Sequence, residues 1–97
     1  MMTDKDREIS FYEYIAGAMN YASKETGKKL AFRKYIILLP KDTVFGRLKI
    51  LGLPVYIVDG MTGDYDLACP FDCTADDEAA LGKIREYKES YRLEVDR

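Results

Sequence analysis

The chain has 97 residues, of which 47% are hydrophobic and 33% charged, and this composition excludes a disordered segment and indicates one globular domain over residues 1–97. The longest apolar run, Ile36 to Pro40, is far shorter than the 20 or so residues that cross a bilayer. The first residues lack the apolar segment of a secretory signal, so we expect a cytoplasmic protein without membrane contact. Because histidine is absent, Ser-His and Cys-His catalytic dyads are excluded.

The first predicted element is a helix over Phe11–Thr26. Ser10 and Glu13 have the spacing of a capping box, in which each side chain bonds the backbone N–H of the other residue. Gly27 suits the left-handed conformation that commonly follows a helix. An earlier start at Thr3 lacks apolar side chains that would anchor the additional turns.

This helix has more apolar surface than one contact covers. Its polar residues form a single stripe, whereas a surface helix usually buries about a third of its circumference. We expect one apolar face to cover the sheet. The second face needs another partner, and it consists of Phe11, Tyr14, Ala18 and Tyr21. That partner is either the C-terminal helix of the same chain or another protein, a second copy included.

Residues 34–69 hold most of the β-branched and aliphatic side chains and predict an antiparallel sheet of three or four strands. The expected strands are 35–39, 44–51, 55–58 and 65–69. Gly52 and Pro54 predict a bend or bulge between the second and third.

The last predicted element is a helix that begins after Thr74. This threonine can cap the helix, and three acidic residues follow it in the first turn, where the helix dipole favours negative charge. The predicted fold is therefore α+β, in the order α-β-β-β-(β)-α, with the N-terminal and the C-terminal helix packed on one face of the sheet.

The net charge of −2 conceals a division along the chain. Residues 24–49 carry eight basic and two acidic side chains, whereas residues 50–97 carry five basic and eleven acidic ones. The basic segment is a candidate nucleic-acid surface because its cations can bind phosphates and its aromatic rings can stack on bases. The candidate residues are Lys28, Lys29, Arg33, Lys34, Arg47 and Lys49. The acidic balance of the whole chain argues against a dedicated nucleic-acid binder.

Three carboxylates, Asp59, Asp64 and Asp66, lie in or beside the last predicted hairpin loop. They are candidate contacts for a protein that binds nucleic acid, since carboxylates can complement a surface built for phosphates. Their spacing does not match a calcium-binding loop.

Cys69 and Cys73 form a C-x3-C pair, but structural zinc needs two further ligands from a chain that has no histidine. We favour two reduced thiols that contribute to packing. A local disulfide, a redox role and a reactive Cys73 ahead of the helix are the alternatives. We expect no metal site and no cofactor.

The sequence contains no recognisable catalytic arrangement and so argues against an enzyme. We expect a small protein-binding module, with homodimerisation through the Phe11–Thr26 helix or a sheet edge as one form. The alternative is a phage-type inhibitor or regulator of a nucleic-acid-handling complex that uses the acidic loop. A further alternative is direct nucleic-acid binding by residues Lys24–Lys49.

Overall fold

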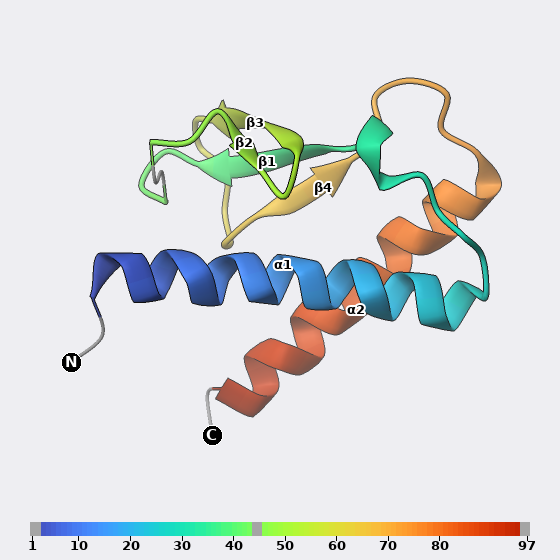
Figure 1. Cartoon of the computed structure of the whole chain (residues 1–97), viewed down its shortest axis with the longest axis horizontal. Helices are drawn as coiled ribbons and strands as arrows, with labels where there is room; N and C mark the ends of the chain where they lie inside the picture. The colour runs from blue at the N-terminus through green and yellow to red at the C-terminus, as the bar shows by residue number, and fades with distance from the viewer. Residues whose placement is uncertain (1–2, 44–45, 96–97) are drawn as a thin grey trace. The chain divides into compact units, whose positions relative to one another are not determined.

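The computed structural model describes residues 3–43 and 46–95. It has the predicted α+β fold, with a helix at each end of the sequence and a four-stranded sheet between them (Figure 1). The elements are α1 (Asp4–Thr26), a short 3-10 helix η1 (Phe32–Lys34), β1 (Ile36–Pro40), β2 (Lys49–Ile50), β3 (Leu53–Val58), β4 (Asp66–Ala68) and α2 (Ala75–Val95).

The chain divides into two compact units, a helical unit of residues 1–30 and 73–97 and a sheet unit of residues 31–72. The single domain and the packing of both helices on one face of the sheet stay predictions.

Helix α1 begins at Asp4, about two turns before the start that the sequence predicts after Ser10. The cause is a capping box at Thr3, whose hydroxyl accepts the N–H of Asp6 at 3.1 Å. The Asp6 carboxylate in turn accepts the N–H of Thr3 at 3.2 Å, so both backbone donors are satisfied without apolar support. Gly27 ends the helix in the left-handed conformation with φ 66°, as the sequence predicts.

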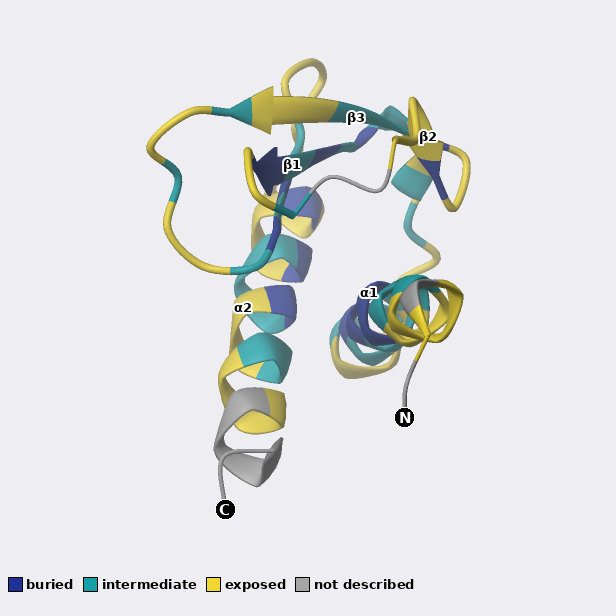
Figure 2. Ribbon diagram, turned by 90° about the vertical axis from the view of Figure 1, so that its left-hand side faces the viewer, coloured by how far each residue is buried: buried dark blue, intermediate teal, exposed yellow. Residues whose placement is uncertain are grey.

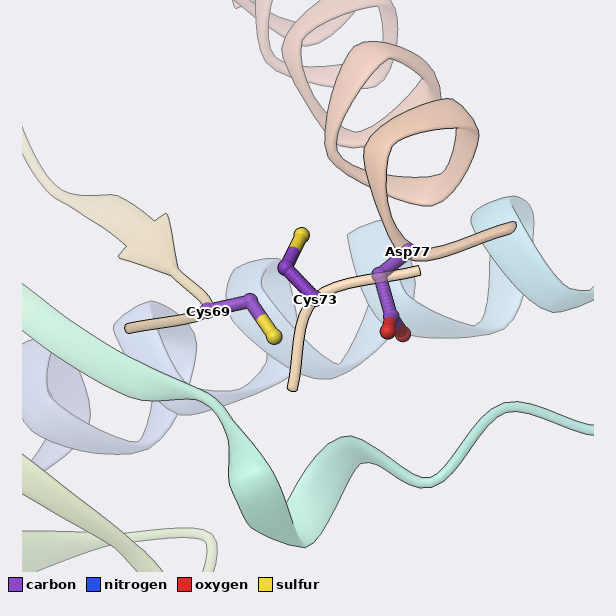
Figure 3. Close-up of side chains that lie close together, drawn as sticks. All are labelled: Cys69, Cys73 and Asp77. Carbon is purple, nitrogen blue, oxygen red and sulfur yellow. The ribbon is translucent and has the colours of Figure 1, made fainter. Parts of the chain in front are cut away.

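Helix α2 begins with the same Thr-x-x-Asp pattern. The N–H of Thr74 donates to Asp77 Oδ2 at 2.9 Å, and the N–H of Asp77 donates to Thr74 Oγ1 at 3.2 Å. The Thr74 hydroxyl also donates to Oδ2 at 3.0 Å. Asp77 is only 2% exposed, and its carboxylate lies at the start of α2 (Figure 3). The predicted cap at Thr74 is therefore present, and Asp77 completes it.

Within the helical unit, α1 and α2 pack against each other (Figure 1). Tyrosine rings make part of this contact. Tyr14 stacks on Tyr91 with ring centroids 4.3 Å apart, and the centroids of Tyr21 and Tyr87 are 5.7 Å apart. Offset or tilted aromatic pairs of this kind stabilise a contact beyond the area that they bury. The side chains buried in the two helices include Tyr14, Ile15, Ala18, Ala22, Ala80 and Ile84.

The sheet is mixed, so the purely antiparallel sheet predicted from the sequence is wrong. The strand order is β2-β3-β1-β4, in which β1 pairs parallel with β3 and antiparallel with β4. After β1 the chain passes beyond the position of β3 and forms β2 at the outside. The β2–β3 hairpin then returns the chain beside β1 in the parallel direction.

The β2–β3 connection is a two-residue turn at Leu51 and Gly52, with φ values of 53° and 79°. Positive φ at both central residues is the pattern of a type I′ turn, which suits the twist of a hairpin. The expected bend is therefore a hairpin turn. The strand predicted over residues 44–51 is only two residues long here, and its first two positions, 44 and 45, lie outside the described residues.

Candidate interaction edge of the sheet

The strand register assigns each side chain of the sheet unit to one of two faces, because successive residues of a strand point in opposite directions. One face, the core face, is mostly buried. Seven of its side chains are at most 2% exposed, and they are Tyr35, Ile37, Leu39, Ile50, Leu53, Tyr65 and Leu67.

Exposure of the core face increases toward the C-terminal end of β3. Ile57 lies on this face opposite Leu39, yet it is 48% exposed. Tyr56, which points to the other face, is 54% exposed, and Leu48, which immediately precedes β2, is 88% exposed. Figure 2 shows this exposed stretch of β3, which follows the part that β2 flanks. The end of β3 therefore presents apolar side chains on both faces.

The backbone of this stretch is also unpaired on one side. The N–H of Val55 donates to the carbonyl of Leu48 at 3.0 Å and so points away from β1. Backbone directions alternate along a strand, so Ile57 also directs its N–H and C=O away from β1. Strand β2 pairs only with Leu53 and Pro54. Among the residues that the structure describes, no strand lies beside Tyr56–Val58 on this outer side. We call this segment the β3 edge.

The opposite edge of the sheet, along β4, is protected. The N–H of Leu67 donates to Asp66 Oδ1 at 2.9 Å, and the N–H of Tyr65 donates to Asp64 Oδ1 at 2.7 Å. These carboxylates occupy backbone donors and place negative charge on the edge, which discourages the addition of another strand. The β3 edge carries no charge, glycine or proline. The two edges therefore differ in their capacity to accept a strand.

The predicted acidic candidates are thus divided. Asp64 and Asp66 are half-buried and bond the backbone of their own chain, whereas Asp59 is exposed in the turn that follows β3. The inhibitor hypothesis, which proposes this acidic loop as the contact with a partner, stays a prediction.

The four residues of the second apolar face predicted for the first helix are buried or half-buried. Ala18 is fully buried and Tyr14 is 8% exposed, while Phe11 meets Tyr14 edge to face at 6.4 Å. For Tyr14 and Tyr21 the partner in the structure is α2, one of the two partners that the sequence allows.

The hydroxyl of Tyr21 has a raised pKa. Burial raises the pKa of Tyr21, and the nearby charges of Glu25 and Glu86 raise this pKa further. Lys83 opposes the rise, and its own pKa is raised by a hydrogen bond to Glu86, with a nitrogen-oxygen distance of 3.2 Å. This phenol is therefore held in its neutral form by the surroundings that α1 and α2 supply.

The basic candidates are spread over both units. Lys28 and Lys29 are exposed after α1, in the helical unit. In the sheet unit, Lys34 donates to the carbonyl of Asp72 at 3.0 Å. The remaining members, Arg33, Arg47 and Lys49, are exposed in the sheet unit. Nucleic-acid binding by this segment stays a prediction.

Both cysteines are reduced. The Cys69 thiol, half-buried after β4, donates to the carbonyl of Phe71 at 3.5 Å. The exposed Cys73 thiol lies 3.8 Å from the carbonyl of Thr74, just ahead of α2 (Figure 3). Each sulfur therefore contacts the backbone of its own loop.

The sequence predicts a sheet edge as one candidate dimer surface but does not identify which edge. The available signal was the run Val55–Val58, which lacks the alternation of polar and apolar residues that a strand with one solvated face requires.

Neither α1 nor α2, over the residues described, combines the length and apolarity needed to cross a membrane. Comparisons with protein-family models, with curated proteins and with solved structures gave no significant match.

Proposed function

We propose that this protein is a protein-binding module that takes up a strand of its partner along the β3 edge. The observation that carries the proposal is Ile57, whose N–H and C=O point outward beside exposed apolar side chains. Strand addition of this kind uses backbone hydrogen bonds for affinity and alternate side chains for specificity.

The expected affinity follows from the size of the edge. Covering the exposed half of an isoleucine contributes about 1 kcal/mol, and each backbone hydrogen bond contributes a similar amount. Association costs at least 4 kcal/mol or so in lost freedom of motion, so a few contacts give only weak binding. The nearly fully exposed Leu48 lies beside the edge and extends the apolar contact that a partner strand can make.

Site-specific photo-cross-linking in cells of the native host tests the proposal. A benzophenone amino acid replaces Tyr56 in one variant and Phe71 in another. Phe71 is the matched control, because it is an aromatic residue of the same unit, 78% exposed, that lies outside the β3 edge. We expect cross-linked products from position 56 and few or none from position 71.

A second change identifies the edge itself as the contact. Ile57→Lys, combined with the photo-reactive residue at position 56, places a charge on the edge and should remove most of the product. Equal yields from positions 56 and 71, or yields that Ile57→Lys leaves unchanged, would contradict the proposal.

A further inference from the structure

We infer that the strand that occupies the β3 edge comes from a second copy of this chain, with the two β3 strands antiparallel about a two-fold axis at Ile57. This inference rests on the proposed function, because it uses the same edge, and it specifies the partner and the register.

The backbone directions determine the register. Tyr56 directs its N–H and C=O to β1, Val58 directs its N–H to β1, and the N–H of Val55 donates to the carbonyl of Leu48. Ile57 is therefore the residue of β3 whose two backbone groups both point outward without a partner among the described residues. When Ile57 lies opposite Ile57 of the second copy, the two residues exchange both N–H···O=C bonds, as in a hydrogen-bonded antiparallel pair. An interface in which both copies use the same patch is the usual form of a dimer.

The length of the free edge suits this arrangement. In this register, Asp59 of the second copy lies opposite Val55, where β2 already occupies the edge. The chain turns at this point, because Gly60 has φ 79° and the N–H of Met61 donates to the carbonyl of Val58 at 3.4 Å. The second copy therefore leaves the edge where β2 begins, so the two chains do not compete for the same position.

Charge complementarity favours a second copy in the antiparallel direction. The N-terminal end of β3 is flanked by the exposed Lys49 of β2, and its C-terminal end is followed by the exposed Asp59. Antiparallel pairing brings the acidic end of each copy to the basic end of the other, twice in the dimer. Parallel pairing would place like charges together, and opposed charges set the orientation of an interface.

The side chains of the edge also match in this register. Tyr56 lies opposite Val58 of the second copy on the outer face, and such aromatic and β-branched pairs are favourable across strands. On the core face, Ile57 meets its own symmetry mate beside the exposed Leu48. Because only a short segment pairs, the dimer is expected to be weak and to depend on protein concentration.

Sedimentation equilibrium of the full chain, from about 1 μM to about 1 mM, measures the dimer dissociation constant in the range expected for weak interfaces. Ile57→Lys should raise this constant about tenfold or more, since it places two positive charges opposite each other. Phe71→Lys is the matched control and should leave it unchanged. Circular dichroism and urea unfolding of each variant establish that it is folded.

A charge exchange between two exposed residues tests the orientation without touching the apolar edge. Asp59→Lys alone and Lys49→Glu alone should each weaken the dimer. The double variant should regain wild-type affinity, because antiparallel self-association pairs the two positions across the interface. A dimer that Ile57→Lys weakens, but in which the double variant is no tighter than either single variant, would overturn the antiparallel register.

The failure of this inference is distinguishable from the failure of the proposed function. A wild-type chain that stays monomeric up to 1 mM or so would overturn the homodimer. If position 56 then cross-links to a different protein, the proposed function is retained. A dimer unaffected by Ile57→Lys would show that the copies associate through another surface. Cross-linked products from position 56 at twice the mass of the chain support the homodimer.

Discussion

The ring of Tyr87 on α2 occupies the space that a side chain at Gly17 on α1 would need. A Cβ atom placed on Gly17 would lie 2.5 Å from Tyr87 Oη and 3.1 Å from Cζ, both closer than ordinary contacts. Tyr87 is held there by neighbouring rings, with centroids 5.7 Å from Tyr21 and 6.2 Å from Tyr14. A glycine in the interior of a helix is unfavourable by itself, so close packing with α2 accounts for its presence.

Gly17→Ala should therefore lower the free energy of unfolding by about 1–3 kcal/mol through overpacking, despite the better helix propensity of alanine. Gly82 in α2 is the matched control, because nothing lies within 4 Å of its Cβ position. Gly82→Ala should raise the free energy of unfolding by up to about 1 kcal/mol. Urea denaturation measures both, and equal stabilisation by the two substitutions would contradict the close packing. In a Tyr87→Phe background the cost of Gly17→Ala should fall, since the nearest atom is gone.

Leu51 adopts a left-handed conformation that is unfavourable for a bulky side chain. Leu51→Asn should raise the free energy of unfolding by about 1 kcal/mol, because asparagine tolerates this conformation and is common in type I′ turns. Leu48→Asn changes the same residue types at an exposed position outside the turn and should have little effect. Thermal unfolding measures both variants, and a melting temperature of Leu51→Asn no higher than that of Leu48→Asn would contradict the prediction.

The protection of the β4 edge depends on Asp66. Asp66→Ala should lower the free energy of unfolding by about 1 kcal/mol, because the N–H of Leu67 loses its acceptor. Asp66→Asn keeps an acceptor oxygen and should cost less, although it also removes the edge charge. Light scattering should show more aggregation for both variants than for the wild type. Equal stability of the two variants would argue against the hydrogen bond to Leu67.

Tyr21 should titrate above its ordinary value of 10.0, since burial first, and then Glu25 and Glu86, raise its pKa in the folded protein. The folded state therefore holds this proton more tightly than the unfolded state, so this contribution to stability is present below about pH 10 and is lost as pH rises further. Carbon-13 NMR of the tyrosine ring measures the midpoint. Glu25→Gln should lower the midpoint, whereas a value at or below 10.0 in the wild type would contradict the proposed environment.

The stability of Tyr21→Phe gives a control for this pH dependence. Lys83 also has a raised pKa, because of its hydrogen bond to Glu86, and it loses its proton in the same alkaline range with the same sign. Tyr21→Phe should therefore lose less stability above pH 10 than the wild type, but some loss should remain.

Local sequence signals predicted much of the fold. The end of α1 at Gly27, the cap of α2 at Thr74 and the apolar strand β1 each depend on a few neighbouring residues, so the sequence predicts them correctly. The start of α1 was missed because the Thr3–Asp6 capping box needs no apolar anchor. The parallel pairing of β1 with β3 was missed because it depends on where β2 lies in space, and a short turn after Pro40 suggests a simple hairpin.

The candidate site was harder to predict than the fold. The sequence identifies the second apolar face of the first helix, and the structure shows that α2 meets it through Tyr14 and Tyr21. Whether an apolar helix face meets its own chain or another is decided by tertiary packing. The β3 edge, in turn, exists only because β2 is two residues long, and no local pattern determined that length.

Amide hydrogen exchange of Tyr56, Ile57 and Val58, measured by NMR at low and at high protein concentration, reports whether the β3 edge pairs with a second copy of the chain. Tyr56 and Val58 donate toward β1, so their amides should be protected at every concentration. The outward amide of Ile57 should exchange rapidly in dilute protein and become protected as the dimer forms. An Ile57 amide that exchanges equally fast at both concentrations would contradict the account.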